Sequence, residues 1–162
     1  ACIADVAARS PELRGMGTTA TLALVLGTRV FVAHAGDSSA YLLLDGALQK
    51  LTRDHTVVAE MVASGELPAH LARRHPMRHV VTNVLGGGER GVFVELHRAR
   101  LRPGDALLLA SDGLTDMLDD AEVASALVRT PDPESAAKVL VALANDAGGR
   151  DNITVVVARY EA

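Results

Sequence analysis

Aromatic residues are scarce in this sequence, which has two phenylalanines, two tyrosines and no tryptophan among 162 residues. Any hydrophobic core must therefore be built from aliphatic side chains. The single cysteine, Cys2, excludes an internal disulfide framework and a zinc site made of cysteines. No apolar run approaches the roughly 18 residues of a membrane span, and no signal peptide is recognisable. These absences favour a protein of a reducing, cytoplasmic compartment.

Strong charge is also lacking, since the formal net charge is only -4 and 22% of the residues are charged. No block of like charges is present, which argues against a nucleic-acid-binding surface. With 49% hydrophobic residues the chain has ordinary globular composition. A length of 162 residues is typical of one domain.

The first part of the chain predicts antiparallel strands. Two residues beginning with glycine, Gly27-Thr28, separate two apolar runs and favour a type II′ hairpin. Asp45-Gly46 is the preferred pair of a type I′ hairpin. Strands joined by such short turns must be antiparallel. The predicted strands are 18–26, 29–35, 39–44 and 47–51.

The later part mixes helices with further strands. Asp54 is a candidate cap for a helix with its apolar stripe from Val57. Asp119 and Glu122 have capping-box spacing, and Asp132 precedes a proline at a helix start. The pattern predicts an α+β domain with strands at 92–101, 106–110 and 153–158 and helices near 1–9, 54–65, 68–74, 119–128 and 132–147.

Three aspartates stand at the ends of the most apolar predicted strands, namely Asp37, Asp112 and Asp151. If those strands are neighbours, three like charges converge, which is unfavourable unless a cation neutralises them. Oxygen ligands without cysteine or histidine favour Mg²⁺ or Mn²⁺. The alternative for each aspartate is ordinary turn chemistry beside a glycine.

Five segments, in order, resemble the motifs of the PPM (type 2C) protein phosphatases, and most closely those of bacterial members. The segments are Arg14-Gly15-Met16-Gly17-Thr18-Thr19, His34-Ala35-Gly36-Asp37-Ser38, Leu51-Thr52-Arg53-Asp54-His55-Thr56, Ser111-Asp112-Gly113-Leu114-Thr115-Asp116 and Gly149-Arg150-Asp151-Asn152. The resemblance runs from about Arg14 to Tyr160.

The resemblance implies a sandwich of two antiparallel sheets flanked by helices, in an α-β-β-α arrangement. It also implies hydrolysis of phosphoserine and phosphothreonine in proteins phosphorylated by a serine/threonine kinase. In this family two Mn²⁺ or Mg²⁺ ions activate a water that attacks phosphorus, so no side chain is assigned as a catalytic group. By resemblance Asp112 and Asp151 bind one ion, and Asp37 with Asp112 holds an accessory third ion.

Other residues receive supporting roles from the same resemblance. Asn152 and Asp116 would support the metal ligands without binding an ion themselves. The alternative is that Asn152 is a turn residue and Asp116 a helix cap, which explains them equally well. Residues 57–88 match the family's flap, which lies beside the active site and affects substrate choice. His79 and Arg78 are its candidate substrate contacts, and the alternative is a solvated basic helix face.

Motifs of the family's first third are not found in this sequence. They include an early acidic ligand, a phosphate-binding arginine and an Asp-Gly-x-Gly-Gly motif. We therefore expect residues 1–162 to be the C-terminal part of one phosphatase domain, without its N-terminal strands and with little activity alone. Two alternatives stay open: a pseudophosphatase that binds without catalysis, and a structural ion-binding domain.

Overall fold

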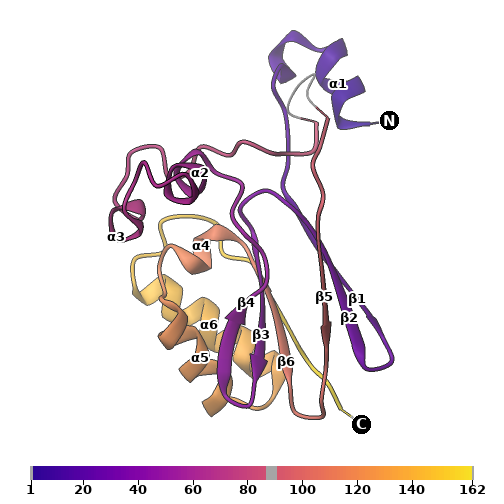
Figure 1. The fold of residues 1–162 in the computed structure, drawn as a ribbon, viewed down its shortest axis with the longest axis vertical. Helices are drawn as coiled ribbons and strands as arrows, with labels where there is room; N and C mark the ends of the chain where they lie inside the picture. Colours follow the sequence, from indigo (N-terminus) through magenta and orange to yellow (C-terminus); the bar gives the residue numbers. More distant parts are fainter. Residues whose placement is uncertain (1, 87–90, 162) are drawn as a thin grey trace.

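Two antiparallel sheets lie face to face in the computed structural model, which describes residues 2–86 and 91–161 (Figure 1). The three-stranded sheet has the order β1-β2-β5 and the four-stranded sheet the order β4-β3-β6-β7. The strands are β1 (Ala20–Leu26), β2 (Arg29–Ala35), β3 (Ser39–Leu44), β4 (Ala47–Lys50), β5 (Glu95–Arg100), β6 (Ala106–Ala110) and β7 (Val155–Arg159). This confirms the predicted α+β sandwich of two antiparallel sheets.

Both predicted hairpins form, with the turn residues in the conformations that their types require. Gly27 has φ +56° between β1 and β2, while Thr28 is not in the positive region. Asp45 and Gly46 both have positive φ, at 49° and 82°, between β3 and β4. A type I′ turn needs positive φ at both central residues, which few pairs other than Asn-Gly and Asp-Gly accept.

The core has two layers, one between the sheets and one beneath the helices. Between the sheets, the buried side chains are Val30, Val32, Ala40, Leu42, Leu101 and Leu107. On the other face of the four-stranded sheet, α5 (Asp120–Arg129) and α6 (Pro133–Asp146) bury an aliphatic cluster that includes Leu108, Leu114, Leu127 and Leu140. Aliphatic side chains thus form nearly all of the core, as the scarcity of aromatic residues predicts.

The helix caps agree with the sequence except at one position. Asp119 and Glu122 form the predicted capping box of α5, and Asp132 accepts a hydrogen bond from the Ser135 amide at the start of α6. The predicted cap at Asp54 is wrong: Thr56 caps α2, while Asp54 pairs with a neighbouring lysine. Across the described ranges, no helix is both long and apolar enough to cross a membrane.

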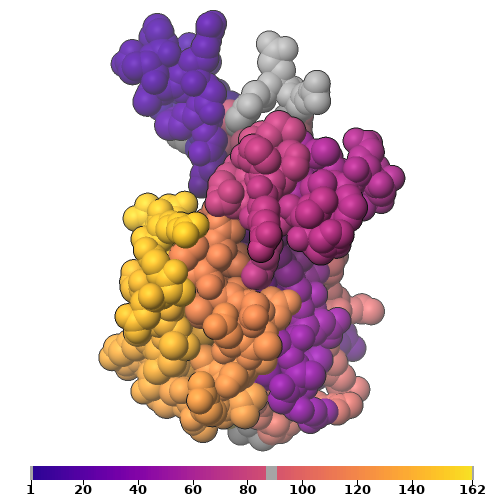
Figure 2. All heavy atoms as spheres, turned by 90° about the vertical axis from the view of Figure 1, so that its left-hand side faces the viewer, coloured from indigo at the N-terminus to yellow at the C-terminus, as the bar shows by residue number. Residues whose placement is uncertain are grey.

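The predicted flap contains two short helices, α2 (Val57–Ala63) and α3 (Ala69–Ala72). It forms a separate mass beyond one end of the sandwich, next to α4 (Asp112–Thr115) (Figures 1 and 2). Two isolated β-bridges hold the flap in place. The bridge from Thr56 to Val81 joins the start of the flap to its end, and the bridge from Thr18 to Leu85 joins its end to the segment before β1. The predicted glycine run at its end includes Gly87 and Gly88, which lie outside the described residues.

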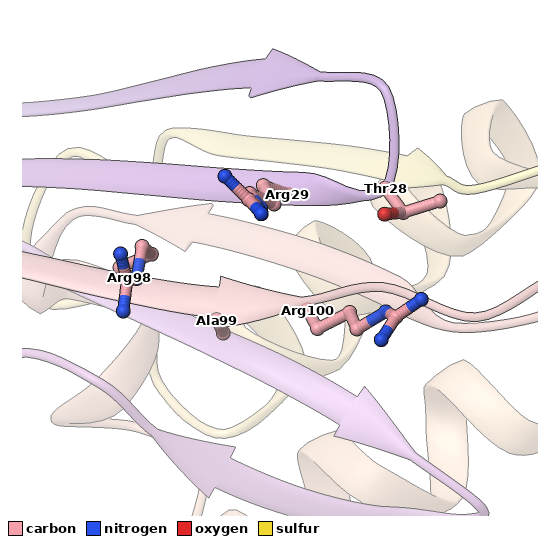
Figure 3. Close-up of a pocket in the computed structure, with 5 residues that line it drawn as sticks. All are labelled: Thr28, Arg29, Arg98, Ala99 and Arg100. Carbon is pink, nitrogen blue, oxygen red and sulfur yellow. The ribbon is translucent and has the colours of Figure 1, made fainter.

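The outer face of the three-stranded sheet is exposed over the described residues. Its leucines, such as Leu22 and Leu96, are 66% and 74% exposed. At the hairpin end of this face, Arg29 lies opposite Arg100 on the neighbouring strand, with Arg98 beside them (Figure 3). Helices thus flank one of the two sheets within the described chain, and α1 (Ile3–Arg9) lies at the end of the molecule (Figure 1).

Candidate metal centre and its flap

Three aspartates lie at connections near the flap end of the sandwich. Asp37 follows Gly36 at the end of β2, Asp112 opens α4 directly after β6, and Asp151 lies between α6 and β7. Because β6 and β7 are neighbours, Asp112 and Asp151 stand on adjacent connections. Asp37 approaches them from the connection between the two sheets.

The pKa shifts of Asp37 and Asp112 indicate that each of these carboxylates has other carboxylates nearby. Burial and then the negative charge of Asp112 raise the pKa of Asp37 above its ordinary value. Burial, followed by Asp151 and Asp116, likewise raises the pKa of Asp112. His79 of the flap acts in the opposite direction on both groups. The fold therefore gathers several like charges, and a cation would relieve their repulsion.

The three carboxylates are too far apart to bind one ion together. A small ion with oxygen ligands at about 2.1 Å needs its ligand atoms within about 4.2 Å of one another. In the part of the chain that the structure describes, only one group of three histidine, cysteine, aspartate or glutamate side chains has all its ligand atoms within 4.8 Å of one another. This group is His34, His55 and Glu95. The three aspartates therefore do not meet around a single point in this structure.

In the cluster of His34, His55 and Glu95, hydrogen bonds to surrounding groups occupy both ring nitrogens of His34. The Nε2 of His34 lies 3.0 Å from the carbonyl oxygen of Gly36, and its Nδ1 lies 2.8 Å from the hydroxyl of Thr21. Because a carbonyl only accepts, Nε2 donates and Nδ1 accepts, so His34 has no free lone pair for a metal. Burial and then the neighbouring His55 lower the pKa of His34, which favours this neutral form.

The segment at Gly113 packs closely against the connection that leads from Asp151 into β7. Gly113 is buried, and a Cβ at this position would collide with the carbonyl group of Asn152. The same carbonyl oxygen accepts a hydrogen bond of 3.1 Å from the Ser111 hydroxyl. The backbone nitrogen of Asn152 also donates to the carboxylate of Asp151 over 2.7 Å, so these contacts of Asn152 come from its backbone.

The flap contacts the α4 segment beside the aspartates. Nδ1 of His79 lies 3.5 Å from the carboxylate of Asp116, and Arg73 donates to the carbonyl oxygen of Thr115 over 3.4 Å. Asp116 also ends α4, where its amide nitrogen donates to the carbonyl oxygen of Asp112 over 2.8 Å. Asp116 thus serves both as a helix end and as a link to the flap.

A cleft of about 530 Å³ separates the flap from the body. Apolar residues of α2 and α3 line one wall, and Tyr41, Asp116 and Asp120 line the other. Arg78 lies half-buried at this cleft, and its side chain makes no ion pair with the described residues. Of the two predicted flap residues, His79 faces the aspartates and Arg78 faces the cleft.

Sequence reasoning left several residues of this region without a role. His55 belongs to a recognised motif, yet nothing in its spacing shows that it is 5% exposed and hydrogen-bonded to the residue before Asp37. Asn83 and Glu95 contact it from distant parts of the chain. Such contacts join residues far apart in sequence, so no local pattern reveals them.

Comparisons with known proteins identify relatives of this chain. Residues 3–61 match the family model described as Protein phosphatase 2C. The chain is 42% identical over 148 residues to the serine/threonine protein phosphatase PstP of Mycobacterium tuberculosis, covering 91% of this chain and 28% of that protein. A crystal structure of the M. tuberculosis phosphatase PstP/Ppp matches with a TM-score of 0.91 and 41% identity, covering 99% of this chain and 67% of that one.

A further solved structure is the catalytic domain of PstP in complex with two manganese ions. It matches with a TM-score of 0.88 and 38% identity, and 66% of its chain is covered. The chain thus spans about two thirds of these solved domains and 28% of the curated M. tuberculosis protein. On both sequence and fold, the chain belongs to the PPM (protein phosphatase 2C) family.

Proposed function

We propose that this chain is the C-terminal part of a Mn²⁺- or Mg²⁺-dependent phosphatase domain that hydrolyses phosphoserine and phosphothreonine in proteins. The observation that carries the proposal is the convergence of Asp37, Asp112 and Asp151 beside a flap, in a chain of the PPM family. The share of the solved relatives that it spans supports the view that the complete domain is larger.

The donor set fits hard divalent cations. All three candidate ligands are carboxylates, and Asp37 and Asp112 have pKa values raised by burial and by neighbouring negative charge. A shared ion would offset that repulsion, and a PstP relative is described with two manganese ions. In this proposal Asp112 and Asp151 hold one ion of a pair, and Asp37 with Asp112 holds an accessory ion.

Bound divalent ions would lower the pKa of the attacking water and offset charge on the phosphoryl oxygens. The chain's own side chains then have positioning tasks. His79 contacts Asp116 and lies within electrostatic reach of Asp37 and Asp112, and in this proposal it contacts a phosphoryl group that enters from the flap side. Arg78, at the cleft, offers a guanidinium to the anionic substrate.

The substrates in this proposal are proteins phosphorylated by a serine/threonine kinase. Nothing in the charge pattern favours nucleic acid as a partner. We place the protein in the cytoplasm, a compartment whose proteins rarely depend on disulfides, because the sequence has a single cysteine.

A pseudophosphatase is the second candidate. It is favoured by the limited donor set of residues 1–162, in which the family's bridging aspartate motif is not found. Such a protein would bind phosphopeptides through the flap cleft without Mn²⁺-stimulated turnover.

The experiment measures phosphate release from a phosphothreonine peptide by the full-length protein, with and without Mn²⁺. We expect Mn²⁺ to stimulate turnover and Asp112→Asn or Asp151→Asn to abolish it. A Lys138→Ala variant, on the exposed side of α6, serves as the control and keeps wild-type activity. Unchanged turnover in either aspartate variant contradicts the phosphatase assignment, and phosphopeptide binding without any turnover favours the pseudophosphatase.

A further inference from the structure

His55 is buried and contacts three parts of the molecule that are distant from one another in sequence. Its Nδ1 lies 3.1 Å from the backbone nitrogen of Gly36 at the end of β2 and 2.8 Å from the side-chain nitrogen of Asn83 at the flap exit. Its Nε2 lies 3.4 Å from a carboxylate oxygen of Glu95 at the start of β5.

The hydrogen-bond partners settle which ring nitrogen carries the proton. A backbone nitrogen only donates, so the Nδ1 of His55 must accept from Gly36. The orientation of the Asn83 amide is fixed independently, because its oxygen accepts from the Phe93 amide at 3.0 Å and its nitrogen donates to the Phe93 carbonyl at 2.8 Å. Both donors therefore converge on Nδ1, and the proton lies on Nε2, facing Glu95.

Gly36 is held by His55 on both sides of the residue. The backbone nitrogen of His55 donates to the carbonyl oxygen of Gly36 over 2.8 Å, while its ring accepts from the amide of the same residue. Gly36 has φ +120°, a conformation that other residues rarely adopt, and a Cβ there would collide with Thr19. Only glycine fits this position, and the two hydrogen bonds to His55 hold its backbone directly before Asp37.

The flap exit depends on the same residue. The amide of Thr82 donates to the carbonyl oxygen of His55 over 2.8 Å, and Asn83 reaches the ring of His55. Thr56, the next residue, caps α2 at the flap entrance. One buried side chain thus holds both the flap stem and the backbone that presents a candidate metal ligand.

We propose that His55 is a positioning residue that couples the flap exit to the placement of the Asp37 carboxylate, through the acceptor at Nδ1. The inference rests on the proposed function in so far as Asp37 binds an ion. Groups that orient metal ligands change metal affinity about 10- to 100-fold when they are removed.

The test distinguishes the contribution of Nδ1 of His55 from that of Nε2 by means of two substitutions. Asparagine places its carbonyl oxygen near the position of Nδ1, whereas glutamine places its amide nitrogen near Nε2. His55→Asn therefore keeps an acceptor for Gly36 and Asn83, and His55→Gln keeps a donor for Glu95. Both variants lose the imidazole from the same buried place, so they are matched for general damage to the fold.

Two measurements use the full-length protein. Amide exchange followed by nuclear magnetic resonance reports the hydrogen bond of Gly36. We expect exchange about tenfold faster in His55→Gln than in His55→Asn. Titration with Mn²⁺, followed by broadening of the Asp37 and Asp112 signals, is expected to show affinity at Asp37 about 10- to 100-fold weaker in His55→Gln than in wild type, and close to wild type in His55→Asn.

Equal Gly36 exchange in the two variants overturns the inference, whatever the metal result. If wild type binds Mn²⁺ and both variants bind it equally well, the coupling to Asp37 is refuted while the proposed function stands. If wild type shows no Mn²⁺ effect at Asp37 or Asp112, the metal part of the proposed function fails, and with it the claim that His55 serves an ion site.

Discussion

Replacing Gly113 with alanine perturbs the candidate metal centre without removing a ligand. The added Cβ would collide with the carbonyl group of Asn152, the residue after Asp151. That carbonyl is held in place by the Ser111 hydroxyl, so the β7 connection cannot withdraw freely. We expect Gly113→Ala to push the connection away from α4 and to separate Asp112 from Asp151.

Two effects of Gly113→Ala oppose each other. Alanine stabilises a helix interior by about 0.5–1 kcal/mol relative to glycine. Overpacking against a fixed neighbour costs about 1–3 kcal/mol. Steric strain outweighs the gain in helix propensity because the clash is with backbone, which cannot rotate away, so the expected net loss is about 0–2.5 kcal/mol. The substitution should weaken Mn²⁺ binding at Asp112 by more free energy than it removes from the stability of the fold.

Gly104→Ala is the matched control for this substitution. Gly104 has φ +93° and open space around its Cβ position, so alanine there costs backbone strain of about 1–2 kcal/mol and touches nothing. Urea unfolding and Mn²⁺ titration of both variants decide the matter. Weakened Mn²⁺ binding in Gly113→Ala but not in Gly104→Ala supports the reasoning. Equal binding in the two variants refutes the idea that Gly113 sets the carboxylate spacing.

Three further outcomes are expected. Asp119→Ala removes the capping box of α5 and should lower the free energy of unfolding by about 0.5–2 kcal/mol, measured by urea titration; no loss contradicts the cap. His34 has a folded-state pKa below 6.5, so the unfolded chain binds more protons and stability falls as pH drops below about 6.5. In His34→Gln the free energy of unfolding should depend less on pH between about 7.5 and about 5.5 than in wild type. If the pH dependence is unchanged, other groups cause it. Arg100→Ser removes one of two arginines that face each other across β2 and β5, and should raise stability by about 0.2–1 kcal/mol at low salt; a gain that persists in high salt argues against charge repulsion.

The strands and turns were largely predictable because their signals are local. Gly27-Thr28 and Asp45-Gly46 mark the hairpins through the φ values that the turns demand. Strand ends were less well predicted: the strand expected from residue 92 begins at Glu95, and the last strand begins at Val155. Asp54 was mistaken for a cap because it precedes a helix, while the nearby Thr56 has the hydroxyl in place.

The candidate site was predictable in part. Asp37, Asp112 and Asp151 were found because they lie at the ends of apolar strands, Asp37 and Asp112 after a strand and Asp151 before one. The structure brings Asp37 and Asp112 within electrostatic reach of one another and Asp112 within reach of Asp151. Their roles as ligands stay a prediction. The contact of His79 with Asp116 joins the flap to the body, and no spacing in the sequence indicates that pair.

The sequence by itself determined the elements, the turn types and the residue types able to hold a hard cation, because these depend on near neighbours along the chain. Tertiary structure alone decided which carboxylates lie near each other, and that Gly36, Asn83 and Glu95 contact the buried ring of His55. The physical reason is that packing two sheets joins residues distant in sequence, and the strength of a hydrogen bond or a charge interaction depends on that distance in space.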